Sequence, residues 1–369
     1  SFVVETALSG KIAESAVGSL SPIIVEALNT VEKNRGHASA ENVSMFKSRK
    51  GSIRDSRLVK GVCLRRRILI EGLPNNIKDA RVVCLDGDIK IREMTRDAEL
   101  KISSADDYEA FLQAENDRKE QISGSIVESG ANLVLCSGEI DKDILHFLND
   151  NGILAIGDLD SSELRNCSDA TGARILETAL DICEENLGIC GSVVWERGQD
   201  SDEVEDVIRI LDCPSPSVVT IEVGGAGEAG TEEVIRGLHD SLRAASLAIR
   251  EEVLPGAGSI HSRMARAVRE SSEAQSGRER LAMEAFARAL ETIPATLVEN
   301  TGGESLDRVL ELRASSKNDS VLGISSDGKL EEINRIWHPR SVIANSLESA
   351  AETAMGMLRI DQVISARGE

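Results

Sequence analysis

The sequence predicts a mixed α+β protein of more than one domain, with an α/β part in its middle and a mainly helical C-terminal part. The chain of 369 residues exceeds the size at which a single hydrophobic core keeps growing. Strand-like apolar runs alternate with helical patterns between about residues 80 and 160. Helical periodicity dominates from about residue 231 to residue 300.

The N-terminal region predicts one helix followed by extended segments. The helix is expected within residues 6–33, introduced by a turn at Ser9-Gly10-Lys11, because its apolar residues share one face: Ile23, Ile24, Ala27, Leu28 and Val31. Residues 51–71 contain two glycines that flank a polar stretch, and the turn signal LPNN follows them. This pattern favours extended segments joined by tight turns.

The middle of the chain predicts βαβ units. RVVCLDGDI, ANLVLC and GILAIGDL are predicted as strands, and DKDILHFLND as a short helix between the last two. The charged stretch 105–128 predicts a helix with few apolar residues, namely Tyr108, Phe111, Leu112, Ile122 and Ile126. Because so narrow a stripe buries little, we expect this helix to project from the body of the protein.

The C-terminal region predicts two further helices. Residues 276–297 are expected to form a core helix that starts at Ser276 as N-cap, with an inward face of Leu281, Ala285, Phe286, Ala289, Leu290 and Ile293. Residues 345–358 predict a second helix, whose small side chains allow close packing.

Composition excludes several classes of function. A net charge of −21 opposes binding to nucleic acid and to anionic membrane surfaces. The chain shows neither a signal peptide nor an apolar run of membrane-spanning length, so we interpret it as cytoplasmic. The seven cysteines form no CxxC pair, and several lie in apolar runs, which favours buried free thiols over a metal or redox role.

Common enzyme motifs are missing or lack their context. GxGxxG occurs at Gly225, Gly227 and Gly230 after a strand-like run, but residues 231–252 look helical where a dinucleotide fold needs a second strand. We therefore interpret it as a glycine turn where the chain changes domain. There is no GxxxxGK[ST], HExxH or GxSxG motif, and the five histidines lie far apart in sequence, without ligand spacing.

Several long motifs in the same order resemble the group II chaperonins, the thermosome type of archaea and the eukaryotic cytosol. GSIRDSRLVKGV (51–62) is similar to the segment that passes from the intermediate to the apical domain, and ATGARI (170–175) to an apical-domain segment. Residues 95–126 resemble the helical protrusion that acts as a lid. Three later motifs resemble equatorial segments: SGRERLAMEAFARALETIP (276–294), LVENTGGESLDRVLELRA (297–314) and MLRIDQVI (357–364).

The resemblance implies a domain division. Residues 1–55 would form a first intermediate segment, 56–222 the apical domain, 223–253 a second intermediate segment, and 254–369 the C-terminal half of the equatorial domain. The family's phosphate-binding loop and GDGTT-type motif precede these segments and do not occur in this sequence.

The resemblance also implies site residues for ATP and Mg²⁺. Asp240 matches the family's aspartate that activates the attacking water, and Lys11, after Gly10, matches a lysine that senses the γ-phosphate. A glycine-rich turn against the nucleotide corresponds to Gly256, Ala257 and Gly258, with alanine in place of the family's middle glycine. Ser325 and His338 stand where the family has an Asn or Asp and an acidic residue that contact the nucleoside.

The implied function is ATP-driven folding of non-native proteins by a ring of chaperonin subunits. Two alternatives stay open on the sequence. In the first alternative, the chain is a client-binding or chaperonin-capping protein that does not hydrolyse ATP. In the second, it is a fragment of an ordinary ATPase subunit. The sequence is compatible with an enzyme and with a protein that is not one.

Overall fold

The structure is a computed structural model of the chain and describes residues 1–10, 16–48, 50–68, 72–91, 105–198, 206–225, 228–316 and 321–360. It divides into two compact units. One unit comprises Ser1–Val25 together with Arg236–Glu369, and the other comprises Glu26–Ile235.

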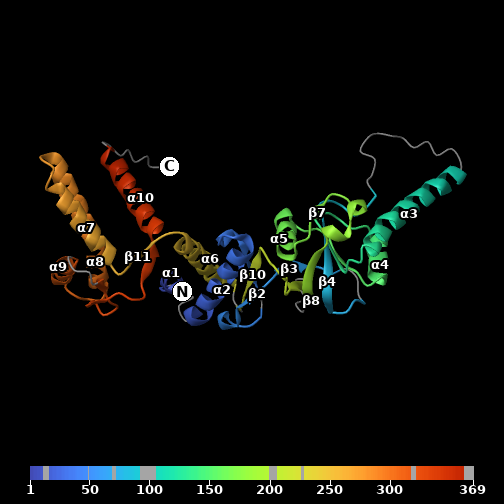
Figure 1. Cartoon of the computed structure of the whole chain (residues 1–369), viewed down its shortest axis with the longest axis horizontal. Helices are drawn as coiled ribbons and strands as arrows, with labels where there is room; N and C mark the ends of the chain where they lie inside the picture. Colours follow the sequence, from blue (N-terminus) through green and yellow to red (C-terminus); the bar gives the residue numbers. More distant parts are fainter. Residues whose placement is uncertain are drawn as a thin grey trace, which may run out of the picture. The chain divides into compact units, whose positions relative to one another are not determined.

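A seven-stranded mixed sheet is the centre of the unit Glu26–Ile235 (Figure 1). Its order is β3-β9-β8-β4-β5-β6, with β7 paired to β4. The strands are β3 (Val62–Arg66), β4 (Asn76–Leu85), β5 (Leu133–Cys136), β6 (Leu154–Ile156), β7 (Ile175–Leu176), β8 (Gly188–Glu196) and β9 (Asp206–Leu211). The neighbours β4, β5 and β6 run parallel, whereas β3, β9, β8 and β4 pair antiparallel.

The parallel half confirms the predicted βαβ units, because α3 (Ala105–Glu128) connects β4 to β5 and α4 (Lys142–Asp150) connects β5 to β6. Successive strand residues point to opposite faces of a sheet. Val82 therefore packs in one apolar cluster with residues of α5 (Ser161–Thr171), and Val83 in a second cluster with residues of α3 and α4. Both faces of the parallel half are covered, so β5, β6 and the end of β4 are apolar throughout.

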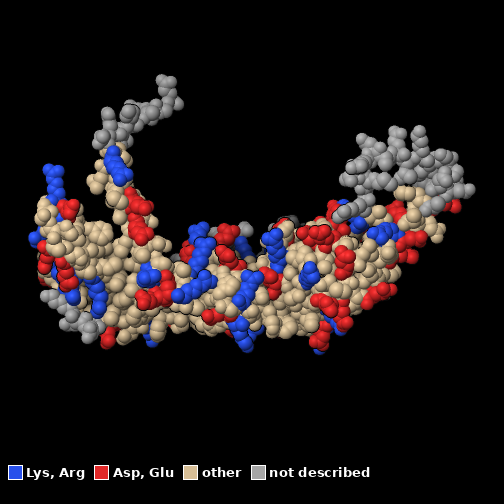
Figure 2. All heavy atoms as spheres, turned by 45° about the horizontal axis from the view of Figure 1, so that its top comes forward, with Lys and Arg blue, Asp and Glu red and all other residues tan. Residues whose placement is uncertain are grey.

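Helix α3 extends away from the seven-stranded sheet (Figure 1). Among the described side chains of α3, the buried apolar one is Ile126 near the C-terminal end, while Phe111 and Leu112 are each 40% exposed. Residues 95–104 of the predicted protrusion lie outside the described residues, and the side chain of Tyr108 lies outside the described side chains. Figure 2 shows acidic side chains gathered over the part of the chain that carries α3 and α4.

A three-stranded sheet completes this unit, in the order β1 (Val43–Lys47), β10 (Val219–Val223), β2 (Arg57–Val59). Helix α2 (Val17–Arg35) confirms the helix predicted within residues 6–33, and Ile24, Ala27, Leu28 and Val31 are buried on it. Short 3-10 turns fill the remaining connections at Ala40–Asn42, Ile53–Asp55, Ala179–Asp181 and Glu184–Asn186.

The other unit is mainly helical and has two small strand pairs, β11 with β14 and β12 with β13. Its helices are α1 (Phe2–Leu8), α7 (Ser259–Ser272), α8 (Arg278–Asn300), α9 (Ser305–Ser315) and α10 (Arg340–Leu358). Its strands are β11 (Val253–Pro255), β12 (Leu322–Ile324), β13 (Leu330–Glu332) and β14 (Trp337–Pro339). Helices α2 and α6 (Glu228–Arg250) each contribute residues to both units.

The prediction for the core helix at 276–297 is wrong about its orientation. The expected inward face is uncovered in this chain: Leu281 is 64% exposed and Phe286 and Ile293 are each 40% exposed, and of that set Leu290 alone is buried. The buried face is Ala287, Leu290, Glu291, Pro294 and Val298, and the N-cap is Gly277 rather than Ser276. The helix buries Glu291 because Arg269 of α7 and Arg313 of α9 each donate two hydrogen bonds to its carboxylate.

Two further expectations are confirmed. Six of the seven cysteines are buried free thiols, and Cys183 is exposed. The glycine motif after β10 leads into α6, which continues to Arg250 where a dinucleotide fold would need a strand. None of the helices in the described ranges is both long and apolar enough to cross a membrane.

Candidate functional site

The predicted glycine-rich turn is a tightly held loop between β11 and α7. The Gly256 N–H donates to the Ile336 carbonyl at 2.9 Å, and the Ile324 N–H donates to the Ala257 carbonyl at 2.9 Å. The turn is therefore joined to the segment before β14 on one side and to β12 on the other. Of the predicted nucleotide-site residues, this arrangement brings Gly256, Ala257 and Gly258 close to Ser325 and His338.

The two glycines of this turn are required by the protein's own packing. A methyl group added at Gly256 would lie 2.4 Å from Ile336 Cγ2 and 2.9 Å from His338 Nε2, and one at Gly258 would lie 2.6 Å from Pro294 Cβ. Gly258 also has a φ of +78°, in the left-handed region that glycine adopts without strain. Ala257, the departure from the family pattern, has a φ of +52°, which costs an L-residue about 1–2 kcal/mol.

His338 lies in β14, opposite Leu254 of β11, and is half-buried beside Gly256. Desolvation lowers the pKa of His338. Desolvation also lowers the pKa of His261, and a charge on nearby His338 lowers it further. Both imidazoles are therefore neutral near pH 7, and they can exchange hydrogen bonds with a ligand but cannot balance its negative charge.

Sequence reasoning missed His261 and Ser262, in the first turn of α7. His261 Nδ1 and Ser262 Oγ are buried and make no hydrogen bond within the described part of the protein. His261 and His338 are far apart in sequence and lie near one another in the structure. The one available signal was the position of His261 and Ser262 directly after the glycine turn, in GAGSIHS.

Ser325 stabilises the hairpin formed by β12 and β13. Its N–H donates to the Lys329 carbonyl at 2.8 Å, and its hydroxyl accepts from the Lys329 N–H at 3.3 Å. The hydroxyl hydrogen stays available to a ligand, because a serine hydroxyl accepts and donates at once.

The remaining predicted residues lie on elements that lead to this turn. Gly10 follows α1, and the Thr6 hydroxyl of α1 accepts a hydrogen bond of 3.3 Å from the N–H of Trp337, the neighbour of His338. Lys11 lies outside the described residues. Asp240 is exposed on α6, which ends shortly before β11.

The family resemblance implies ATP with Mg²⁺, and the residues fit the two parts of that ligand unequally. The backbone of the turn, the two neutral imidazoles and the Ser325 hydroxyl suit contact with a nucleoside. No group of three or more His, Cys, Asp or Glu side chains that could hold a metal ion occurs within the described ranges. In proteins Mg²⁺ is commonly held by one or two carboxylates together with the phosphates of the nucleotide, so a Mg²⁺ site on this chain would depend on the bound ATP.

A second candidate site is a groove of about 560 Å³ on the seven-stranded-sheet unit. Helix α4 forms one wall, with Leu145 and Asn149, and the β6 residues Leu154–Ile156 form another. Ile68 and Leu73, from the connection between β3 and β4, complete the apolar lining.

Polar groups surround this apolar lining. The Oδ1 atom of Asn149 is buried and makes no hydrogen bond with the described residues. Arg67 and Lys142 line the groove as exposed cations, and neither forms an ion pair within the described ranges. Arg66, by contrast, pairs with Glu163. Glu139 and Asp158 also line the groove, so its apolar floor is bordered by charges of both signs.

Comparison with known proteins gives consistent results. The model of the TCP-1/cpn60 chaperonin family matches residues 2–368. Thermosome subunit beta of Archaeoglobus fulgidus is 33% identical over 374 residues, covering 99% of this chain and 68% of that protein. Thermosome subunit alpha of Methanothermobacter thermautotrophicus is 33% identical over 370 residues, covering 99% of this chain and 67% of that protein.

A solved structure agrees with these matches. The open-state monomer of a group II chaperonin from Methanococcoides burtonii superimposes with a TM-score of 0.65 at 25% identity, covering 97% of this chain and 84% of that one. The predicted resemblance and the mixed multidomain fold are thereby confirmed. Because the family model spans nearly the whole chain, the chain belongs to the TCP-1/cpn60 chaperonin family, as a group II chaperonin subunit of the thermosome type.

Proposed function

We propose that this chain assists the folding of non-native proteins by capturing their apolar segments in the groove beside α4. The observation that carries this proposal is an open groove whose floor is apolar. Residues 56–222 would be the apical domain, with α3 in the protrusion. The intermediate segments 1–55 and 223–253 and the partial equatorial domain 254–369 stay predictions.

The chemistry of the groove suits an extended client segment. Apolar client side chains would lose contact with water against Ile68, Leu73 and Leu145, at roughly 25 cal/mol per Å² buried. Recognition of this kind depends on contiguous exposed apolar side chains, which folded proteins mostly bury.

Binding of a permanently unfolded protein, reduced and carboxymethylated lactalbumin, tests this proposal. Leu73→Ser removes a half-buried leucine from the groove, and Phe147→Ser removes a phenylalanine that is 42% exposed on α4 and does not line the groove. We expect Leu73→Ser to weaken binding about tenfold, since roughly 1.4 kcal/mol of lost burial is a factor of ten, and Phe147→Ser to leave it unchanged. Equal affinity of the Leu73→Ser variant and the unmodified chain would reject the groove as the capture site.

For the nucleotide, we propose that the turn around Gly256 binds the nucleoside part of ATP. Calorimetry with adenosine and with ATP, each with and without Mg²⁺, tests this on the purified chain, beside Asp240→Ala and with phosphate release recorded. We expect similar affinities for adenosine and ATP and no dependence on Mg²⁺. Binding of ATP that requires Mg²⁺, with turnover lost in Asp240→Ala, would instead support the predicted catalytic role of Asp240.

The second candidate function is capture of clients without ATP hydrolysis. It is favoured by the groove beside α4, whose apolar lining would hold a client segment without a bound nucleotide. Assembly with other chaperonin subunits into a ring, and a cytoplasmic location, stay predictions from the family and the sequence.

A further inference from the structure

The seven-stranded and three-stranded sheets are connected by two short peptides. Residues 60–61 join β2 to β3, and residues 212–218 join β9 to β10. Short peptides limit how far two sheets can separate but do not fix the angle between them. Contacts between the side chains of the two sheets must therefore define their arrangement.

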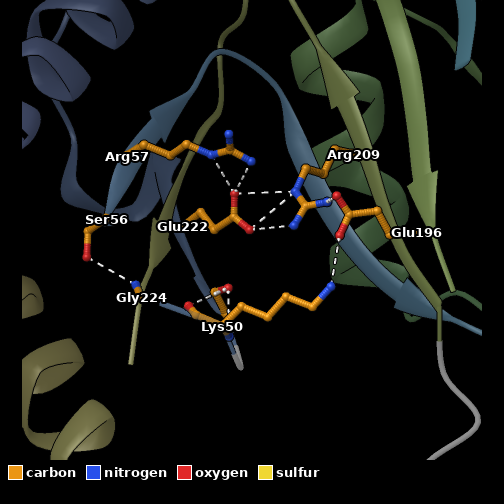
Figure 3. Close-up of polar contacts among 8 residues, drawn as sticks. Lys50, Ser56, Arg57, Glu196, Arg209, Glu222 and Gly224 are labelled. Atoms are coloured by element: carbon orange, nitrogen blue, oxygen red, sulfur yellow. Dashed lines mark hydrogen bonds and ion pairs between the residues drawn. The ribbon is translucent and has the colours of Figure 1, made fainter. Parts of the chain in front are cut away.

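A buried carboxylate lies at this junction. Glu222 of β10 has a side chain only 6% exposed, and it lies between Arg57 of β2 and Arg209 of β9 (Figure 3). Arg209 Nη2 donates to Glu222 Oε1 at 2.7 Å, and Arg57 Nε donates to Glu222 Oε2 at 2.8 Å. The Arg209 side chain is 9% exposed, so this ion pair between the two sheets is almost completely shielded from water.

Glu222 and Arg209 keep each other in their charged forms. Burial alone would raise the pKa of Glu222, but the hydrogen bonds from Arg209 and Arg57 outweigh it and lower that pKa. The pKa of Arg209 is raised by Glu222 in spite of desolvation. Both groups are therefore ionised over the whole physiological pH range.

A second set of contacts extends the same junction. Glu196 of β8 lies 3.4 Å from Arg209 and 3.6 Å from Lys50, which follows β1 (Figure 3). We call Lys50, Arg57, Glu196, Arg209 and Glu222 the junction network.

Contacts between β3 and β1 add to the junction network. Arg65 of β3 donates to the Lys47 carbonyl of β1 at 2.7 Å and lies 5.3 Å from the centre of the Phe46 ring. The apolar part of the junction is small, with Phe46, Val59 and Cys63 as its buried residues.

We propose that the junction network holds the two sheets as one rigid body. Apolar contacts tolerate sliding because they are not directional, whereas a displacement that separates Glu222 from Arg209 leaves two buried charges without partners. The network therefore permits one arrangement of the sheets and penalises the others.

This rigidity has a consequence that rests on the proposed function. Strand β10 precedes α6, the helix that carries Asp240. A displacement of β10 would be passed, through Glu222 and Arg209, to the sheet that carries the client groove. Movement within this unit would be concentrated outside the sheet junction.

Distance measurement between spin labels on the two sheets tests the proposal. One label is placed on Cys183, the exposed native thiol on the seven-stranded-sheet side, and the other on Glu41→Cys, an exposed position next to β1. We expect a single narrow distance distribution in the otherwise unmodified chain. Glu222→Gln removes the charge with little change of shape, and we expect loss of the single narrow peak. Glu26→Gln removes an exposed ion pair with Lys60 near the junction and should leave the peak unchanged.

A double variant keeps the test valid if Glu222→Gln does not fold. Arg209→Met with Glu222→Leu leaves no unpaired charge in the pair and refills the space with apolar atoms. We expect this variant to fold and to lose the narrow distance distribution, because apolar side chains keep the packing of the junction but lack the directional ion pair. A narrow peak in every folded variant would overturn the proposal, even if stability fell. The test does not depend on client binding, so failure of the groove experiment would leave its result intact.

Discussion

Gly258 and Gly10 provide a matched pair that separates backbone strain from packing in the candidate nucleotide site. Their φ values are +78° and +74°, so alanine at either position meets the same left-handed strain of about 1–2 kcal/mol. Replacing glycine also restricts the unfolded chain, which returns roughly 0.5–1 kcal/mol. Gly10→Ala should therefore destabilise the protein by about 0–1.5 kcal/mol.

Gly258→Ala carries an additional cost. Its methyl group would lie 2.6 Å from Pro294 Cβ, whereas no described atom lies within 4 Å of a methyl group at Gly10. Overpacking of this kind costs about 1–3 kcal/mol. We expect the free energy of unfolding of Gly258→Ala to fall below that of Gly10→Ala by this amount, which corresponds to a urea midpoint lower by about 1 M.

The assay needs a signal from the correct unit. The chain has two tryptophans, Trp195 in the unit Glu26–Ile235 and Trp337 in the other unit. In a Trp195→Phe background, the fluorescence of Trp337 follows the unit that contains both glycines. Equal midpoints for the two alanine variants would refute the conclusion that Gly258 is required by contact with Pro294.

The remaining predictions concern Glu291, Cys183 and Ala257. Glu291→Gln should lower the free energy of unfolding by about 2–4 kcal/mol, because it leaves Arg269 and Arg313 without their shared carboxylate, whereas Glu311→Gln in an exposed pair should change it by less than about 0.5 kcal/mol. Burial alone would raise the pKa of Glu291, but hydrogen bonds from the two arginines lower that pKa. The contribution of Glu291 to the free energy of unfolding is therefore present above the ordinary pKa of 4.5 and is lost as pH falls through the lower, folded-state pKa. Acid titration of stability should show this loss in the unmodified chain and not in Glu291→Gln. Cys183 should be the single thiol that reacts with a disulfide reagent at pH 8 in the native chain, because burial raises the pKa of Cys63 and Cys84 to about 12; a second reacting thiol without unfolding would contradict this. Ala257→Gly should stabilise the protein by up to about 1 kcal/mol in urea unfolding, since it removes left-handed strain at a φ of +52°, and a loss of stability would show that the Ala257 methyl group contributes packing.

Elements whose periodicity is strong were predictable from the sequence. DKDILHFLND forms α4 and ANLVLC contains β5, because each buries a continuous apolar set against its immediate neighbours along the chain. Helix α1 was not predicted, since seven residues are too few to show a period. The outward orientation of Leu281 was missed because an apolar stripe indicates which face a helix can bury, not whether anything covers it.

The candidate sites depend on contacts that no local pattern contains. The family resemblance identified Gly256 and His338, and the structure brings these two residues together. It could not reveal that Gly258 packs on Pro294 or that His261 lies near His338, because these partners are distant in sequence. Glu222 was missed for the same reason, since a charged residue within a strand is interpretable only once Arg57 and Arg209 are placed beside it.

The uncovered side of α8 also affects how the isolated chain behaves at high concentration. Leu281, Phe286 and Ile293 expose an apolar stripe that favours self-association, while the net charge of −21 makes copies repel one another. Salt shortens the range of that repulsion to roughly 8 Å at physiological ionic strength and leaves the apolar attraction intact. The colloidal stability of this protein should therefore fall as ionic strength rises, and replacing Leu281 with a charged residue should restore it.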